Sequence, residues 1–433
     1  MVDLALSTDN SSANLLMPED AGAHEWYSFV LSYPPHLVRH YLTRFGIDGS
    51  NRVLDPFCGI GTTVVESKKN GIPSVGIEAN PMAWFASTVK TDWRPEPGAL
   101  LADASSIAAT VTEALRAEGL EDVPLLFPNS TPPLRTLPAE SDRLLLKNSI
   151  SPLPLHKALT LLDAIDNTSV PEHRAHYRLA FAKALVDSAS NLSFGPEVGV
   201  SAVKPDAPIV GPWLRGVRRM ADDLDDLGSC DMTPTEVHLA DSRHASEVLE
   251  PNSIDAVITS PPYPNEKDYT RTTRLESVLL GFIRNRADLQ EVKRGLLRSN
   301  TRGVYKGDDD DQWVKAFPEI LRIAHAIEDR RKELGKTSGF ERLYARVTML
   351  YFGGMARHLT ELRRALKPGA RLAYVVGDQA SYLRIMIRTG ELLASIAESV
   401  GYEVTGIDLF RTRLATATRQ QLREEVVVLR WPG

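Results

Sequence analysis

VLDPFCGIGTT, residues 53–63, joins a short apolar strand to a glycine-rich turn and to the start of a helix. The glycines let the backbone at the carboxyl end of the strand approach a ligand closely, and the first turn of the helix offers free amide groups. A second strand, over residues 74–78, ends in Glu78, whose carboxylate can accept hydrogen bonds from ribose hydroxyls. This order of strand, helix and strand predicts a Rossmann-like unit that binds an adenosine-containing ligand.

The overall composition is that of an ordinary globular protein. The chain has 433 residues, 43% hydrophobic and 24% charged, which suits one catalytic domain with large insertions or two domains. Its two cysteines, Cys58 and Cys230, are too few for a disulfide framework or a structural zinc site, so no metal is expected. The sequence has neither an apolar run of about 18 residues nor a basic-then-apolar N-terminus, which favours a cytoplasmic protein.

The alternation of strands and helices is interrupted twice. It is lost after about residue 91 and resumes with a strand over 237–240, and a second charged, mostly helical stretch follows the strand at 254–258. These breaks predict one catalytic domain in three parts, with two helical insertions and an N-terminal arm. The predicted segments are a mobile arm at 1–22, a cofactor-binding part at 23–95, a first insertion at 96–232, a catalytic part at 233–270, a second insertion at 271–345 and a C-terminal part at 346–433.

The C-terminal part is regular. Its apolar periodicity predicts two helices and three strands, and the closing pair of strands predicts a mostly parallel sheet with an antiparallel strand near one edge. The expected order is helix 347–366, strand 370–376, helix 390–400, and strands 402–409 and 425–429.

The sequence TSPPY, residues 259–263, follows directly on the apolar strand at 254–258. Consecutive prolines force an extended backbone, which makes the local carbonyls rigid acceptors. The Ser260 hydroxyl and the Pro261 carbonyl could accept the two hydrogens of an exocyclic amine on a base, and Tyr263 offers a face on which that base can stack. A plain turn, or a ligand for a small adaptor domain, is the alternative interpretation.

Both segments resemble motifs of the DNA amino-methyltransferase family. Residues 55–63 resemble the family's cofactor loop, and residues 259–263 resemble its catalytic motif. In that motif a serine directly before the two prolines, here Ser260, goes mainly with cytosine. The resemblance implies an α/β fold of the Rossmann-like class I methyltransferase type, with a mostly parallel seven-stranded sheet and two largely helical insertions. It also implies S-adenosylmethionine as the cofactor and double-stranded DNA, with the target base flipped out, as the substrate.

The resemblance assigns site residues one by one. The catalytic residues would be Ser260, Pro261, Pro262 and Tyr263. The cofactor-binding residues would be Tyr33, Asp55, Phe57, Gly59, Gly61, Thr62, Thr63, Glu78, Asn80, Asp241 and Ser242, with Glu78 on the ribose and Asp241 on the adenine. The cofactor loop here precedes the catalytic motif, so the chain is circularly permuted relative to the commonest cytosine-N4 enzymes.

A basic stretch between Lys267 and Lys306 predicts a DNA-contacting surface on a chain whose net charge is −6. A solvated helix face is the alternative, and the acid run at 308–311 is interpreted as a solvated loop rather than a metal site. The expected DNA contacts are Asn265, Lys267, Tyr269, Arg271, Arg274, Arg298 and Arg302.

The hypothesis is therefore a site-specific DNA cytosine-N4 methyltransferase, with a cognate restriction endonuclease as a candidate partner. The alternatives are a DNA adenine-N6 methyltransferase, an RNA base-amine methyltransferase and a non-catalytic DNA-binding subunit. A cytosine-C5 enzyme is disfavoured because it needs a cysteine nucleophile after a proline, and neither Cys58 nor Cys230 follows one.

Overall fold

The structure is a computed structural model. It describes residues 17, 20–28, 32–123, 133–195, 197–228, 232–265, 267–414 and 420–433. Most of the predicted arm at 1–22, together with Cys230, lies outside these residues. None of the described helices is long and apolar enough to cross a membrane.

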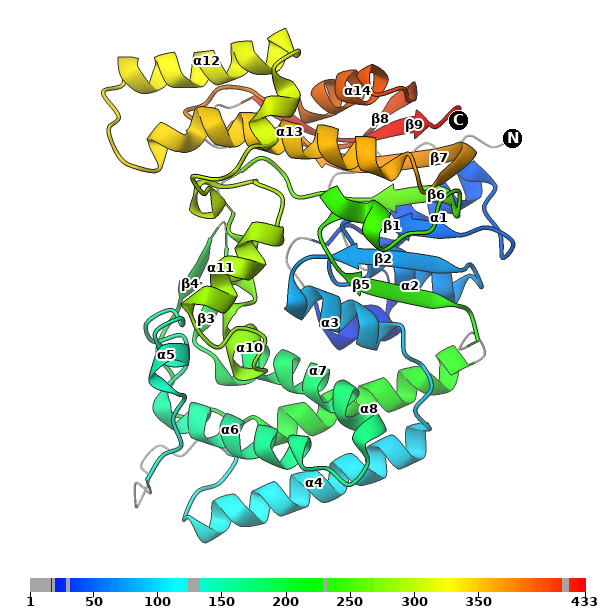
Figure 1. Ribbon diagram of the computed structural model, residues 1–433. Helices are drawn as coiled ribbons and strands as arrows, with labels where there is room; N and C mark the ends of the chain where they lie inside the picture. Colours follow the sequence, from blue (N-terminus) through cyan, green and yellow to red (C-terminus); the bar gives the residue numbers. More distant parts are fainter. Residues whose placement is uncertain are drawn as a thin grey trace.

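The described residues form a central sheet of seven strands in the order β5-β2-β1-β6-β7-β9-β8 (Figure 1). Neighbouring strands pair in parallel from β5 to β7, whereas β9 is antiparallel to both β7 and β8. The prediction of an α/β fold with a mostly parallel sheet is confirmed. The strands are β1 (Val53–Asp55), β2 (Ser74–Glu78), β5 (Thr235–Leu239), β6 (Ile254–Thr259), β7 (Leu366–Gly377), β8 (Glu403–Leu414) and β9 (Gln421–Arg430).

Helices cover both faces of the sheet because its central strands are apolar on both sides. In β1, Val53 packs in one buried cluster with Tyr41, while the next residue, Leu54, packs in another with Phe352. Successive side chains of a strand point to opposite faces, so each strand contributes to two cores. The helices nearest the sheet are α1 (Pro35–Phe45), α2 (Thr62–Lys69), α3 (Pro81–Lys90), α13 (Tyr344–Leu362) and α14 (Thr389–Ser399).

The ends of α1 and α3 follow from local sequence. Pro35 occupies the first turn of α1, where its fixed φ and missing N–H are tolerated, and Gly46 ends the helix with φ of 65°. Asn80 caps α3, since its side-chain oxygen accepts a hydrogen bond from the Met82 N–H at 3.1 Å. The cap fixes the backbone directly after β2.

The expected helix at 347–366 is wrong at its C-terminal end. The helix α13 ends at Leu362, and Leu366 already pairs with Ile254 at the start of β7. Gly369, which has φ of 86°, lies inside β7, where the register of pairing with β6 shifts between Ile254 and Ala256, rather than in a turn before the strand. Apolar residues 365 and 366 fit the helical period, but pairing with β6 takes them into the sheet.

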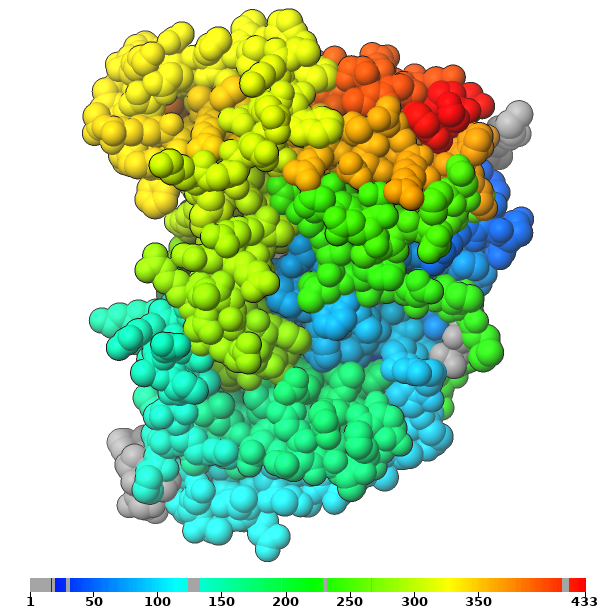
Figure 2. Space-filling model, in the orientation of Figure 1, coloured from blue at the N-terminus to red at the C-terminus, as the bar shows by residue number. Residues whose placement is uncertain are grey.

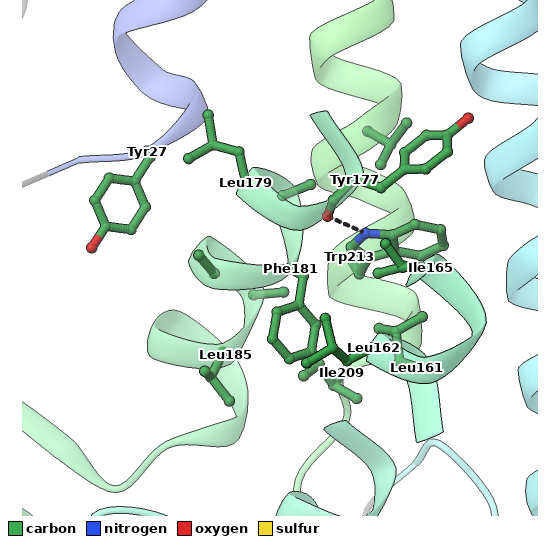
Figure 3. Packing of buried hydrophobic residues seen from close by; sticks show 14 of the residues in the cluster. Tyr27, Leu161, Leu162, Ile165, Tyr177, Leu179, Phe181, Leu185, Ile209 and Trp213 are labelled. Atoms are coloured by element: carbon green, nitrogen blue, oxygen red, sulfur yellow. Dashed lines mark hydrogen bonds between the residues drawn. The ribbon is translucent and has the colours of Figure 1, made fainter. Parts of the chain in front are cut away.

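The first insertion forms a helical layer beside α3 (Figure 1). Its centre is Trp213, which is fully buried and donates from its indole N–H to the Tyr177 carbonyl at 3.0 Å (Figure 3). The same apolar cluster includes Val65 of α2 and Met82 of α3, so the insertion shares a core with the sheet helices. Its elements are α4 (Pro97–Ala117), α5 (Ala139–Asp142), α6 (Pro152–Asp166), α7 (Arg174–Ala184), β3 (Leu192–Phe194), β4 (Val198–Val200) and α8 (Val210–Leu227).

The second insertion runs along one side of the molecule, and Figure 2 shows it in yellow-green and yellow between the first insertion and the C-terminal part. Leu275 belongs to the core of the first insertion, whereas Ile323 packs with α13. The insertion therefore bridges two cores. Its helices are α9 (Tyr269–Thr272), α10 (Arg274–Leu279), α11 (Arg286–Gly295) and α12 (Pro318–Glu333).

A candidate functional site at the carboxyl edge of the sheet

A cavity of about 590 Å³ lies at the carboxyl ends of the parallel strands. Its lining includes residues at or just after the ends of β2 and β6, and it reaches β7, β8 and the second insertion. The chain first adds β2 and β5 on one side of β1, and then adds β6 and β7 on the other side. The strand order therefore changes direction between β1 and β6. Open α/β sheets bind ligands at such a switch point, because the loops that follow the two strands diverge there.

Asp55 lies under the floor of the cavity, at the end of β1. Its carboxylate accepts hydrogen bonds from the Thr259 hydroxyl at 2.5 Å, the Tyr33 hydroxyl at 3.1 Å and the Phe57 N–H at 3.1 Å. Burial raises the pKa of Asp55 to about 6, although the hydrogen bond from Thr259 opposes that rise. Asp55 thus ties the end of β1 to the end of β6, which joins the two sequence motifs in space.

Glu78 lines the cavity at the end of β2. One carboxylate oxygen accepts the Gly59 N–H at 2.8 Å, and the other accepts the Asn80 N–H at 2.7 Å. Burial raises the pKa of Glu78 to about 7, against the effect of these backbone hydrogen bonds. The carboxylate is fixed in place and keeps lone pairs for ligand hydroxyls, as the predicted ribose contact requires.

The glycine-rich turn depends on small residues. Gly61 has φ of 93°, and a Cβ there would come within 3.0 Å of the Ser87 Cβ. Gly76 of β2 faces Cys58, since a Cβ on Gly76 would lie 2.6 Å from the Cys58 sulfur. Burial raises the pKa of the Cys58 thiol well above its usual value, which keeps it protonated. Cys58 is therefore a packing residue of the turn.

Ser260 follows β6 and lines the cavity. Its hydroxyl donates to the Val375 carbonyl of β7 at 3.2 Å. Because a hydroxyl has a single hydrogen, this bond leaves the oxygen of Ser260 as an acceptor toward the cavity. A group that carries two N–H donors, such as an amine, fits such an acceptor.

Tyr263 lies beside the end of β7. A Cβ on Gly377 would come within 2.8 Å of the Tyr263 ring, so the glycine makes room for the aromatic face. The Tyr263 N–H donates to the Tyr269 hydroxyl at 3.4 Å, and both tyrosines line the cavity. Sequence reasoning missed Gly377; its one signal is a glycine at the end of the apolar run at 372–376.

Most of the predicted catalytic and cofactor-binding residues lie at this cavity. Asp241 lies just outside the lining, between Ala240 and Ser242, which do line it. The Asp241 carboxylate accepts the Arg243 guanidinium at 2.6 Å, and its contact with the adenine of a cofactor stays a prediction. The predicted residues in the lining are Tyr33, Phe57, Gly59, Thr62, Glu78, Asn80, Ser242, Ser260, Pro261, Pro262 and Tyr263; Asp55, Gly61 and Thr63 lie behind it.

The predicted DNA contacts divide into two groups. Arg298 is 4% exposed, and its guanidinium donates to Asp308 at 2.9 Å, while Arg274 donates to the Thr270 carbonyl at 3.1 Å. Both side chains bond inside the protein, and Arg298 also lines the cavity. The others lie in or near the cavity: Asn265, Lys267 and Tyr269 line it, and Arg271 and Arg302 are 3.9 Å and 3.8 Å from Glu197, which also lines it.

The interpretation of the acid run at 308–311 as a solvated loop is wrong for two of its residues. Asp310 is 3% exposed and accepts the guanidiniums of Arg243 and Arg357, and Asp308 pairs with Arg298. The described residues contain no cluster of three or more metal-ligating side chains. The run acts as an anchor for the second insertion.

Comparison with known proteins relates the chain to methyltransferases, although no protein-family model matches it. It is 24% identical over 446 residues to the Type II methyltransferase M.BsoBI of Geobacillus stearothermophilus, covering 94% of this chain and 84% of that protein. The Type II methyltransferases M.AvaI of Nostoc sp. and Anabaena variabilis are each 32% identical over 198 residues, which is 42% of this chain and 39% of theirs.

This chain is similar to one solved structure, TrmN from Thermus thermophilus. The match covers 92% of this chain and 48% of the TrmN chain, at 11% sequence identity. Its TM-score of 0.29 is too low to support any argument about the site. The relation to methyltransferases therefore depends on the curated homologues.

S-adenosylmethionine is the cofactor of this chain, since methyltransferase homologues of this class take their methyl group from it. The residues present fit it. The Glu78 carboxylate lines the cavity and is held by the Gly59 N–H, a position that suits the predicted ribose contact. A cavity of about 590 Å³ is in the range that accommodates a cofactor-sized molecule.

Proposed function

We propose that the chain is a DNA methyltransferase that transfers a methyl group to the exocyclic N4 amine of a flipped-out cytosine. The observation that carries the proposal is the hydrogen bond from the Ser260 hydroxyl to the Val375 carbonyl at 3.2 Å. It turns the oxygen of Ser260 into an acceptor next to a cofactor cavity. A cofactor that donates a methyl group and a turn that can accept the hydrogens of an amine both support methylation of an amine.

The residues of the chain act by positioning. Ser260 and the Pro261 carbonyl accept the two amine hydrogens, and this draws the nitrogen lone pair out of conjugation with the ring and directs it to the cofactor side. Tyr263 stacks on the extruded base, which lowers the cost of removing that base from the helix. S-adenosylmethionine held at this site would supply an electrophilic methyl group: the amine nitrogen would bond to the methyl carbon as the carbon–sulfur bond breaks, S-adenosylhomocysteine would leave, and one amine proton would pass to solvent.

DNA as the substrate is supported by the Type II methyltransferases among the homologues. Lys267 in the cavity lining and Arg271 and Arg302 near it can neutralise phosphates beside the extruded base. The Type II names of the homologues also support a cognate restriction endonuclease as a partner. Cytosine is supported by the serine at position 260, as the family resemblance implies.

The direct test is to incubate DNA and RNA separately with the protein and S-adenosylmethionine, and to identify the methylated nucleosides by mass spectrometry. The proposal expects N4-methylcytosine from DNA and no product from RNA. Methyladenine as the sole product would overturn the cytosine assignment. Product from RNA alone would overturn DNA as the substrate.

A Ser260→Ala variant tests the carrying observation. We expect turnover to fall roughly 100-fold, because the amine loses one of its acceptors, while cofactor affinity changes little. Ser399→Ala, at an exposed position on α14, is the matched control. Equal losses of turnover and of cofactor affinity would show that Ser260 supports the cavity as a whole instead of orienting a base.

A further inference from the structure

Gln379 has a buried amide that the described structure leaves without a partner. The side chain is 4% exposed, and it lines the same cavity as Ser260 and Tyr263. Among the residues that the structure describes, none pairs with its Nε2 atom. A buried donor without an acceptor is costly, so its place in a cavity wall points to a ligand.

The position of Gln379 is fixed by its backbone. Its N–H donates to the Ile387 carbonyl at 3.1 Å, and its carbonyl accepts the Ile387 N–H at 2.7 Å. These bonds hold the segment just beyond β7. Within the described part of the chain, the amide nitrogen of the side chain takes no part in this arrangement, so its N–H can donate to a ligand.

Three alternate positions, two at the end of β7 and one just beyond it, lie beside the same part of the cavity. The Val375 carbonyl orients Ser260, Gly377 admits the Tyr263 ring, and Gln379 comes next. Gly377 and Gln379 are alternate positions, and alternate side chains of an extended segment face the same side. The sheet places β7 next to β6 and three strands away from β2, whose Glu78 is the residue predicted to contact the ribose of the cofactor. Gln379 therefore lies on the half of the cavity that carries Ser260 and Tyr263.

We propose that Gln379 is a specificity-determining residue whose side-chain N–H donates to the ring nitrogen adjacent to the target amine. This inference rests on the proposed function of the site. In cytosine and adenine that ring nitrogen is an acceptor, whereas in thymine and guanine the corresponding nitrogen carries a hydrogen. The Gln379 donor thus selects bases that bear an amine beside an acceptor, and it fixes the ring while Ser260 and the Pro261 carbonyl hold the amine.

The test compares Gln379→Met, which keeps the size of the side chain but has no N–H, with Gln421→Met at an exposed position on β9. We expect kcat/KM for DNA to fall roughly 10- to 100-fold in the first variant and to stay unchanged in the second. Binding of S-adenosylmethionine, measured by isothermal titration, should be the same in both variants as in the natural protein. That binding also verifies folding.

A modified substrate separates a base contact from a structural role. Replacing the target cytosine by 3-deazacytosine, which has a carbon at the ring position, should slow the natural protein more than the Gln379→Met variant. Equal slowing of both proteins, or an unchanged kcat/KM in Gln379→Met, would overturn the inference. So would a loss of S-adenosylmethionine affinity in that variant, because the amide would then contact the cofactor.

The two proposals fail in different ways. If the natural protein methylates no DNA, the proposed function fails and the specificity comparison has no substrate. If the natural protein forms methylcytosine and Gln379→Met does so equally well, the role of Gln379 alone is overturned.

Discussion

The two insertions are attached to the same sheet by different kinds of interaction. The first is an apolar body: Trp213, Tyr177 and Phe181 are fully buried in one cluster that continues into the sheet helices (Figure 3). In the described structure it reaches the cavity lining through Glu197 alone. Its contribution to the molecule is therefore chiefly packing.

The second insertion is tied down by charges and by close backbone contact. Arg243 bridges Asp241 and Asp310, and its guanidinium also donates to the Arg294 carbonyl at 3.0 Å. A Cβ on Gly353 of α13 would overlap the carbonyl of Asp310, so that helix must present glycine there. Lys293, Leu296 and other residues of this insertion line the cavity.

The difference shows how a wall of a polar site can be held in place. The second insertion also packs apolar residues, such as Ile323, against α13. The part of it that carries Asp310 is held by buried ion pairs, whose charge-assisted hydrogen bonds are directional, and by the close backbone contact at Gly353. Each mode of attachment responds to substitution in its own way.

Removing the apolar centre should have the largest effect. Trp213→Ala is expected to lower the free energy of unfolding by about 3–5 kcal/mol, because it leaves a large void and removes the indole hydrogen bond to the Tyr177 carbonyl. Chemical denaturation measures this loss. Trp313→Ala, at a residue that is 37% exposed in the second insertion, is the control and should cost much less. Similar losses in both variants would contradict the contrast between the insertions.

Neutralising the ionic anchor should have the next largest effect. Asp310→Asn removes a buried charge from between Arg243 and Arg357, and we expect a loss of about 2 kcal/mol. Hydrogen exchange should quicken over residues 286–314 and stay unchanged around Trp213. Asp309→Asn, at an exposed neighbour, is the control. Uniform quickening across both insertions would show that they unfold as one unit.

Glu78 and Asp55, at the ends of β2 and β1, belong to neither insertion, so their ionisation provides a reference for the comparison of the two insertions. The pKa of Glu78 is raised to about 7, and in the proposed cofactor contact the ribose hydroxyls would donate to its ionised form. Affinity for S-adenosylmethionine should therefore rise about tenfold between about pH 6 and pH 8. Protonation of Asp55, whose pKa is about 6, should lower the affinity further at lower pH. Titration calorimetry of Glu78→Gln should show a flat profile above about pH 7; a persisting rise there would assign the ionisation to another group.

The smallest effect is expected where the two insertions meet. Glu197 of the first lies 3.8 Å from Arg302 and 3.9 Å from Arg271, and the side chains are substantially exposed. Such pairs contribute little, so Glu197→Gln should change the free energy of unfolding by less than about 0.5 kcal/mol. Thermal unfolding measures this. A loss several times larger would show that the pair holds the insertions together.

Much of the fold could be predicted because the relevant signals are local. The strand and turn at 53–63 and the prolines after Ser260 fix backbone conformation over a few residues, and the structure brings both to one sheet edge. The end of α13 could not be predicted, since pairing of Leu366 with Ile254 competes with helical periodicity. Neither Arg298 nor Asp310 could be placed, because a charged residue looks the same in sequence whether it is solvated or paired.

By itself, the sequence determined the α/β class and the two motifs that meet at the cavity. Each of these depends on residue type at short spacing. Only the tertiary structure decided which long-range partners each side chain has: Val375 for Ser260, Gly377 for Tyr263 and a glycine of α13 for Asp310. These contacts join residues about 40 to 120 positions apart, and no local pattern encodes such pairings because burial and charge compensation are properties of the assembled core.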